Sequence, residues 1–267
     1  MIPNPFTSSL AEFISNFQEP GAIIRSRIQD IHDEVLCRSA HIRQPNFASI
    51  HRHDLEFLFE AYDVRFFGGR CRLALSRSRI RFRLSRRMTS AGGATTRFLL
   101  ANGEANYEIT IAASLLFDSF GHGDRRITVG GVECDNRLQA LQRIFEHELI
   151  HLAEQLCWQK SDCAAIRFQD IAARHFLHRA HTHSLVTRKE RAAEAGIRIG
   201  SRVSFIFEGQ ELNGRVNRIT KRATVLVQDP EGSQFSDGSR YKTYYVPLVH
   251  LKISESNGTA VSMRNQK

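Results

Sequence analysis

The stretch from Asp135 to Leu156, DNRLQALQRIFEHELIHLAEQL, decides the fold. Asp135-Asn136 predicts a helix N-cap, because short oxygen-bearing side chains accept hydrogen bonds from the first free backbone N–H groups of a helix. The apolar residues behind the cap recur at helical spacing and predict one buried face: Leu138, Leu141, Ile144, Phe145, Leu149 and Leu152. The pattern therefore predicts a long amphipathic helix at the centre of a domain.

Inside this helix, His147-Glu148-Leu149-Ile150-His151 is an HExxH motif. Residues i and i+4 share one face of a helix, so both imidazoles can converge on one Zn²⁺, and Glu148 can act as a general base toward water. The same motif would also occur in a surface helix with two solvated histidines. Burying these polar groups among apolar neighbours without a partner would be costly, so the context favours a metal site with His147 and His151 as ligands.

A third protein ligand is needed, and several downstream residues are candidates. Cys163 lies just past the expected end of the helix, where a chain that turns back could present its thiolate to the metal. The alternatives are a defective site, in which Cys163 is a buried inert thiol, or one of the later histidines: His175, His178, His181 and His183.

Residues before this helix predict an α+β domain. Residues 1–45 have apolar residues at near-helical spacing, interrupted by Pro20-Gly21, and predict a loosely attached leader that is helical or partly disordered. A helix is expected from His51 to Tyr62. Alternating or β-rich segments at Ser78–Ser85, Thr95–Leu100 and Tyr107–Ile111 then predict a small antiparallel sheet. A further helix is expected from Ala164 to about His178.

The chain changes character after residue 188. Residues 189–199 predict a linker that begins with a charged, helical KERAAEA segment. Residues 200–253 contain five short β-rich segments separated by turn signals, which predict a small all-β barrel of SH3-like or Tudor-like type. The polar tail, residues 254–267, is expected to be disordered.

Five stretches together resemble one known family. They are LEFLFEAYDVRFFGGRC (55–71), RFRLSRRMTSAGGATTR (81–97), YEITIAASLL (107–116), FEHELIHLAEQL (145–156) and FQDIAARHFLH (168–178). In order and spacing they are similar to the SprT-like zinc metallopeptidases, whose eukaryotic relatives include Spartan. The similarity runs from His51 to about Leu185, roughly half of the chain.

The resemblance implies a zincin-like metallopeptidase domain over residues 46–188, with Zn²⁺ on His147 and His151 and Glu148 as the catalytic residue. It also implies recruitment to DNA, where Spartan-like members digest crosslinked proteins. Two features depart from the family. Its His-Gly-x-x-aromatic segment, which supplies the third ligand, reads Ala164-Ala165-Ile166-Arg167-Phe168 here, with Cys163 as the nearest substitute. The C-terminal zinc ribbon is replaced by the predicted barrel.

A formal net charge of +9 and a pI near 9.7 favour polyanionic partners, nucleic acid first. Nine arginines fall between Arg65 and Arg87, and the alternation along one predicted strand places Arg79, Arg81 and Arg83 on its solvent face. The barrel adds cations with interleaved tyrosine, predicted to hold phosphates and stack on bases: Arg215, Arg218, Lys221, Arg222, Arg240, Tyr241 and Lys242. A solvated basic face is the alternative for both groups.

Five cysteines without a CxxC pair argue against a disulfide framework and favour a reducing compartment, the cytoplasm or nucleoid. The N-terminus has no basic segment before an apolar one, so a secretory signal is not expected, and no apolar stretch is long enough for a membrane span. The leading hypothesis is a zinc-dependent hydrolase that cleaves protein substrates at DNA. The alternatives are a nucleic-acid-binding protein with a degenerate protease domain and a peptide-binding adaptor that uses the barrel.

Overall fold

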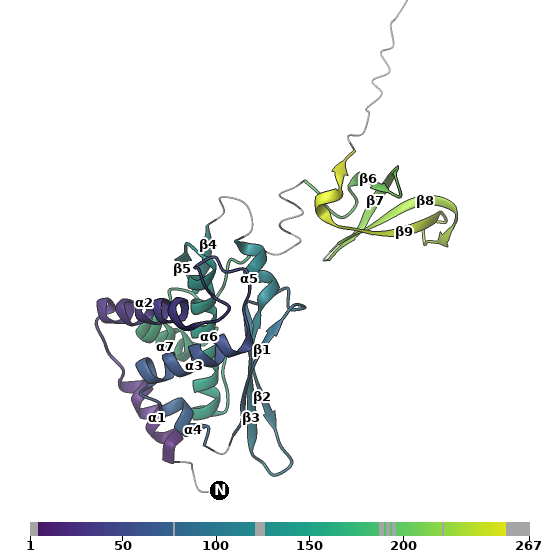
Figure 1. Cartoon of the computed structure of the whole chain (residues 1–267). Helices are drawn as coiled ribbons and strands as arrows, with labels where there is room; N and C mark the ends of the chain where they lie inside the picture. The colour runs from purple at the N-terminus through teal and green to yellow at the C-terminus, as the bar shows by residue number, and fades with distance from the viewer. Residues whose placement is uncertain are drawn as a thin grey trace, which may run out of the picture. The chain divides into compact units, whose positions relative to one another are not determined.

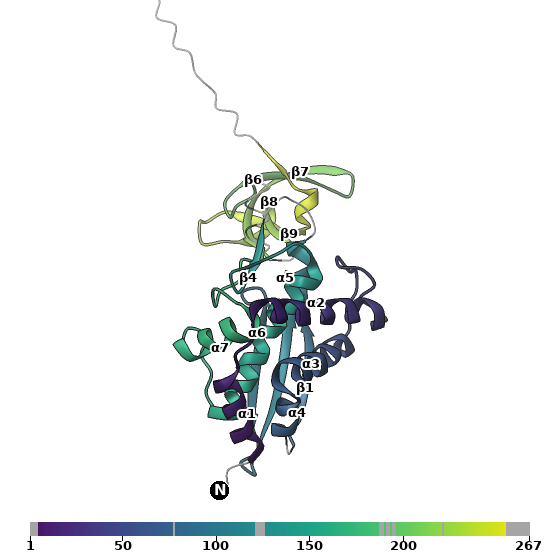
Figure 2. The ribbon, with the colours of Figure 1, turned by 90° about the vertical axis from the view of Figure 1, so that its left-hand side faces the viewer.

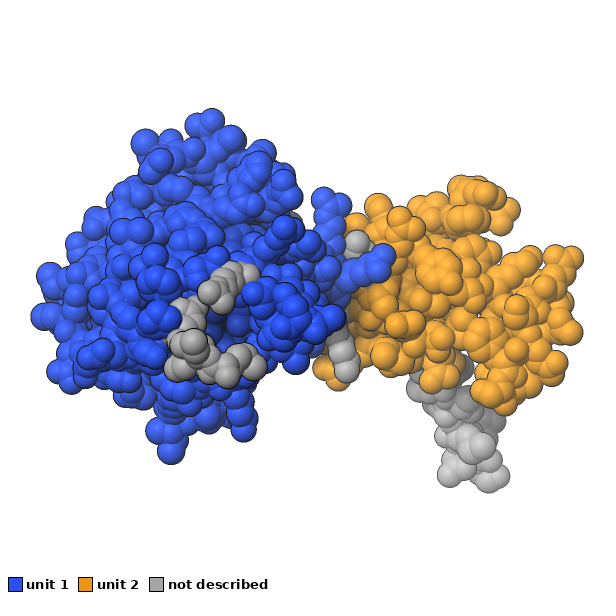
Figure 3. Space-filling view, turned by 90° about the horizontal axis from the view of Figure 1, so that it is seen from below, with its two compact units in different colours: residues 1–186 blue, residues 187–267 orange. Residues whose placement is uncertain are grey.

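The computed structural model describes residues 5–76, 78–120, 126–186, 190, 193, 196–220 and 222–254. The chain divides into two compact units, residues 1–186 and 187–267 (Figure 3). Most of the predicted KERAAEA connector, Lys221 and the tail beyond Ser254 lie outside the described residues. Within the described part of the chain, no helix is both long and apolar enough to cross a membrane.

Helices in the first unit gather on one side of a three-stranded sheet (Figures 1 and 2). The helices are α1 (Pro5–Asn16), α2 (Gly21–Arg38), α3 (Arg52–Phe67), α4 (Arg70–Ala74), α5 (Ala113–Ser119), α6 (Arg137–Trp158) and α7 (Ile166–Phe176). Helix α6 is central and buried along most of its length, and the Asn136 side chain caps it by accepting a hydrogen bond from the Gln139 N–H at 3.0 Å. The predicted amphipathic helix and its cap are confirmed.

The leader is an integral part of this unit, so the expectation of a loose attachment is wrong. Apolar side chains of α1 and α2, such as Leu10, Ile14 and Ile31, are completely or almost completely buried in the same core as α6. Arg174 of α7 also donates hydrogen bonds to the backbone oxygens of Ile14 and Phe17, at 3.0 and 2.7 Å. The apolar faces of the leader helices are therefore buried against the rest of the first unit.

The sheet has the order β1-β3-β2, with β1 (Ile80–Ser85), β2 (Gly93–Leu99) and β3 (Ala105–Ala112). Strands form at the three predicted places, but the sheet is mixed and not antiparallel, because β1 pairs with β3 in parallel. β2 and β3 form a hairpin across the Asn102-Gly103 turn, and β1 pairs with the free edge of β3 and not with that of β2. Strand β3 is the most buried of the three, which suits the central position, and the arginine-bearing β1 suits an edge.

A two-stranded ribbon completes the first unit. Strands β4 (Ile127–Val129) and β5 (Val132–Cys134) pair antiparallel and contact α6. The segment 178–184 lies against β4, and Val129 and His183 form an isolated antiparallel bridge. The ribbon fixes the backbone of His183 through this bridge.

The second unit is an antiparallel sheet of five strands in the order β10-β6-β7-β8-β9. The strands are β6 (Arg202–Phe207), β7 (Gln210–Ile219), β8 (Ala223–Gln234), β9 (Arg240–Val246) and β10 (Lys252–Ile253). It has its own small core around Val203, Phe205 and Val225. The predicted SH3-like barrel is not closed, because the described edge strands β9 and β10 do not pair. Half of the expected last strand, residues 248–253, is instead a 3₁₀ turn, Leu248–His250, and β10 has only two residues.

Candidate metal centre

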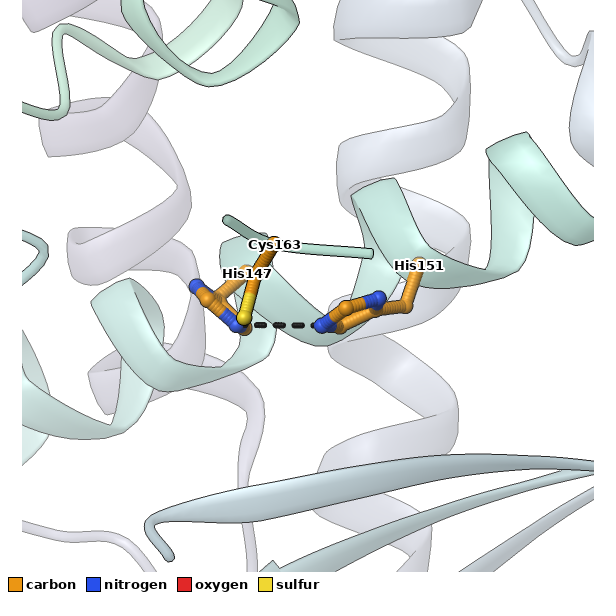
Figure 4. A group of neighbouring side chains, drawn as sticks. All are labelled: His147, His151 and Cys163. Carbon is orange, nitrogen blue, oxygen red and sulfur yellow. Dashed lines mark hydrogen bonds between the residues drawn. The ribbon is translucent and has the colours of Figure 1, made fainter. Parts of the chain in front are cut away.

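Helix α6 and the loop after it bring His147, His151 and Cys163 together (Figure 4). The Nε2 atoms of the two histidines are 3.1 Å apart, and no pair among the two imidazole donors and the Cys163 sulfur is separated by more than 4.8 Å. Two nitrogens that each lie about 2.0–2.1 Å from a tetrahedral metal ion are about 3.3 Å apart. The three side chains could therefore hold a metal ion.

The loop 159–165 turns back because Gln159 ends α6 in a left-handed conformation, with a φ of 57°. Asp162 then closes a turn around Cys163, since its carboxylate accepts from the Ala164 N–H at 2.9 Å and its carbonyl from the Ala165 N–H at 3.0 Å. The half-buried Cys163 is thus presented toward α6 by backbone geometry and not by chance side-chain packing. Burial raises the pKa of its thiol.

The orientation of His151 is fixed by a chain of polar side chains. Its Nδ1 lies 2.7 Å from Ser161 Oγ, and that hydroxyl donates its only hydrogen to the buried Glu154 carboxylate at 2.6 Å. Ser161 must therefore accept a hydrogen bond from His151 Nδ1–H, so the lone pair of His151 is on Nε2, which lies 3.1 Å from His147 Nε2. Arg167 Nε holds the other oxygen of Glu154 at 2.6 Å. Such outer partners set the tautomer and raise the basicity of a ligating imidazole.

His147 is more enclosed. Phe168 packs against both metal-facing rings, with centroid distances of 4.8 Å to His147 and 4.6 Å to His151. Burial lowers the pKa of His147 to about 2, so the ring is neutral, as a ligand must be. Its Nδ1 is buried without a hydrogen-bond partner among the described residues. A metal ion would bind the other nitrogen, Nε2, which lies 3.1 Å from His151 Nε2, so the fit of the site to a metal ion comes from the donor set and its spacing.

Glu148 lies beside this group, on the side of β2. Thr95 Oγ1 is within hydrogen-bond distance of both its Oε2, at 2.8 Å, and its backbone oxygen, at 2.9 Å. A Cβ added to Gly93 would lie 2.7 Å from Glu148 Cγ and Oε1, so the carboxylate occupies space that only glycine leaves open. Burial raises the pKa of Glu148 to about 8. The carboxyl is therefore protonated at neutral pH until a nearby cation favours its charged form.

The later histidines have different environments. His175 is stacked between Phe17 and Phe67, and His178 Nε2 lies 2.9 Å from the buried Glu146 carboxylate, so both belong to the core. His181 is half-buried beside a cavity of about 330 Å³ that is also lined by Phe168, Ala172 and Arg179. His183 lies next to the group of His147, His151 and Cys163, with its ring centroid 4.7 Å from that of His147. Burial lowers the pKa of His183 to about 4.

Sequence reasoning missed the supporting residues Thr95, Gly93, Ser161, Glu154 and Phe168. The sequence marks Gly93 only as the second of two glycines ahead of a β-rich segment. The others carry no local signal, because each acts across a contact between elements that are distant in the sequence.

The predicted nucleic-acid residues fall into two separate groups. In the first unit Arg79 and Arg81 are exposed on the sheet face opposite the helices and form no salt bridge with a described residue, whereas Arg83 Nε pairs with Glu108 at 3.4 Å. In the second unit Arg215, Arg218 and Arg222 are exposed. The strand register also places Arg202, which sequence reasoning missed, directly opposite Arg215.

Three predicted residues of β9 are engaged within their own hairpin. Arg240 donates to the Gly232 carbonyl at 3.0 Å, and the Tyr241 hydroxyl donates to Asp237 at 2.9 Å. Lys242 Nζ pairs with Asp229 at 2.8 Å and with Glu231 at 3.4 Å. The two carboxylates neutralise the charge of Lys242, so Arg215 and Arg218 of β7, which are exposed and form no salt bridge with a described residue, are better placed for phosphate contact.

Removing the hydroxyl that orients His151 should weaken metal binding. In Ser161→Ala the His151 ring loses its acceptor and Glu154 loses a donor, so we expect zinc affinity to fall by about 10- to 100-fold, as for other outer partners of metal ligands. Competition with a chromophoric chelator measures this directly. Ser15→Ala, which removes an exposed hydroxyl on α1, is the matched control. An unchanged affinity in Ser161→Ala would show that the polar chain does not support a ligand.

Comparisons of the chain with protein-family models, with curated proteins and with solved structures find no match.

Proposed function

We propose that this chain is a zinc-dependent endopeptidase that acts on proteins at nucleic acid. The observation that carries the proposal is the convergence of His147 Nε2, His151 Nε2 and Cys163 Sγ. Beside them lies the buried Glu148, whose pKa is raised by burial. Two imidazoles and a thiolate form a donor set suited to Zn²⁺ and leave a fourth position open, as catalytic zinc sites do. The resemblance to SprT-like metallopeptidases supports the same assignment.

The chemistry follows from these side chains. A zinc ion held here would act as a Lewis acid toward water and the peptide carbonyl. Glu148 would take a proton from the attacking water as its oxygen bonds to the carbonyl carbon. The same proton would then pass to the amide nitrogen as the C–N bond breaks, which yields a carboxyl and an amine and returns Glu148 to its starting state. Thr95 orients the carboxylate, and Ser161 and Glu154 orient His151.

The surroundings are suited to an extended peptide. β2 is an edge strand, so its outer backbone groups can pair with a substrate chain, and Gly93 and Thr95 at its start adjoin Glu148. The cavity of about 330 Å³ against α7 shares Phe168 with the metal group and could receive a substrate side chain.

Metal content and cleavage test the proposal together. We expect about one zinc per purified, untagged chain, measured by elemental mass spectrometry after dialysis, because three ligands retain the ion better than two. Fluorescently labelled casein should be cleaved with this protein, and removal of zinc by a chelator should abolish cleavage until zinc is restored. A zinc content near zero, or cleavage that survives chelation, would refute the proposal.

The second candidate is a nucleic-acid-binding protein whose protease domain is inactive. It is favoured by Ala164 and Ala165, which stand where the family has its His-Gly pair, together with the exposed arginines on both units. Binding of DNA by a chain that holds no zinc and cleaves nothing would support this candidate. Under the peptide-binding alternative, neither unit would bind DNA.

Nucleic-acid contact by the sheet face is tested with Arg79 and Arg81. Each lost phosphate contact lowers the slope of log affinity against log salt by about 0.9 on duplex DNA, so the double alanine variant should lower it by about 1.8. Fluorescence anisotropy with a labelled duplex at several salt concentrations gives the slope. Arg126→Ala, whose side chain faces Glu133 at 3.6 Å, is the control. An unchanged slope in the double variant would exclude this face from the interface.

A further inference from the structure

His183 is held next to the metal group by its backbone. The N–H groups of Arg179 and Ala180 both donate to the Gly130 carbonyl, at 2.7 and 3.0 Å, and the Ser184 N–H donates to the Thr128 carbonyl at 2.7 Å. These contacts fasten the segment 178–184 to β4 on both sides of His183. The backbone that carries its imidazole is therefore held in place on both sides of the residue.

The hydrogen bonding of His183 defines its tautomer. The Gly130 N–H points at His183 Nδ1 from 3.3 Å, and it is shared with the Thr182 carbonyl at 3.1 Å. A backbone N–H can only donate, so Nδ1 is an acceptor and the proton of the neutral ring sits on Nε2. His183 thus carries an N–H group at Nε2, whereas His147 and His151 would each offer a nitrogen lone pair to a metal ion.

The imidazole of His183 lies between the start of β2 and the ring of His147. A Cβ added to Gly92 would lie 3.4 Å from His183 Cδ2, the atom bonded to Nε2, and the next residue, Gly93, is the one that adjoins Glu148. On the other side, the His183 and His147 rings meet edge to face, at 75°. The His183 ring therefore lies beside a candidate metal ligand and beside the glycine that precedes Gly93, the neighbour of the proposed base.

We propose that His183 is a further catalytic residue, which donates a hydrogen bond from Nε2 to the carbonyl oxygen of the scissile peptide bond. This inference rests on the proposed peptidase function and deepens it. Negative charge develops on that oxygen when water adds to the carbonyl carbon, and a donor already fixed in place stabilises it without reorganisation. His183 remains uncharged throughout, and no proton leaves it.

The test uses the full chain loaded with Co²⁺ in place of zinc. Acetohydroxamate, a small chelating anion that mimics the charged oxygen, is titrated while the visible spectrum of the metal is followed. His183→Ala should bind metal like the wild type but bind acetohydroxamate about tenfold more weakly, the loss expected for one hydrogen bond. His183→Gln keeps an N–H donor near the position of Nε2 and should retain most of the affinity.

Cleavage of labelled casein by the zinc forms gives a second measure. We expect kcat of His183→Ala to fall by about 10²- to 10³-fold with little change in KM, and kcat of His183→Gln to fall far less. Thr182→Ala, which changes only the exposed side chain next door, should behave like the wild type.

The outcomes separate this inference from the proposed function. A wild-type chain that binds no metal overturns both. If the wild type binds metal and acetohydroxamate, an unchanged affinity in His183→Ala overturns the role of His183 alone. Loss of metal from His183→Ala overturns it as well, because His183 would then be a ligand and not a donor to substrate.

Discussion

Glu148→Gln is expected to keep its zinc and to lose about 10³- to 10⁴-fold in kcat, near the upper end of what a general base contributes. The amide has the shape of the carboxylate and can still accept the hydrogen bond from Thr95, so the fold and the three candidate ligands stay in place. It cannot take a proton from water at any working pH. Steady-state cleavage of labelled casein, with zinc content measured on the same samples, checks both halves of the expectation.

The control for this variant is Glu56→Gln, which removes an exposed carboxylate on α3 far from the metal group in sequence. It should cleave like the wild type. Full activity in Glu148→Gln would show that another group accepts the proton, and the mechanism would fail. Loss of zinc would show that Glu148 supports the ligands and does not act as the base.

Cys163→Ala should lower zinc affinity by at least about 100-fold, because loss of an outer partner alone costs about 10- to 100-fold and a direct ligand contributes more. Two histidine ligands would remain, because the described residues offer no other group of candidate metal ligands than His147, His151 and Cys163. Cys157→Ala is a matched control, since that thiol on α6 is also half-buried but contacts the Thr7 carbonyl at 3.7 Å. Competition with a chromophoric chelator measures all three proteins.

The pH dependence gives this prediction a second readout. Burial raises the pKa of the Cys163 thiol, and only the thiolate binds zinc, so binding must release a proton below that pKa. The affinity of the wild type should therefore fall with decreasing pH more steeply than that of Cys163→Ala, by about one further tenfold step per pH unit. Parallel pH profiles would mean that Cys163 stays protonated and outside the metal shell.

The central helix and two of the candidate ligands could be predicted because their signal is local. The i, i+4 spacing of His147 and His151 places them on one helical face whatever the rest of the chain does. The cap at Asn136 is likewise a property of neighbouring residues. The parallel pairing of β1 could not be predicted, because it depends on whether β1 joins the hairpin at β3 or at β2, a contact between distant segments.

The leader shows the same division. Its apolar spacing correctly indicates helices, but the interruption at Pro20-Gly21 wrongly suggests a loose attachment. In the structure the break only redirects the chain, and α1 and α2 pack separately into the core of the first unit. In the second unit, five β-rich segments were visible, but the two-residue length of β10 leaves the sheet open.

The sequence by itself determined the helix, the HExxH pair of imidazoles with Glu148 between them, and the basic character of the chain. The tertiary structure alone decided that Cys163, and not His175 or His178, joins the two histidines, and that His183 lies beside them. It also brought Thr95, Gly93 and Ser161 to the site. The physical reason is that helical geometry acts over four residues, whereas these groups meet only after the turn at Gln159, the ribbon of β4 and the edge of β2 have packed against α6.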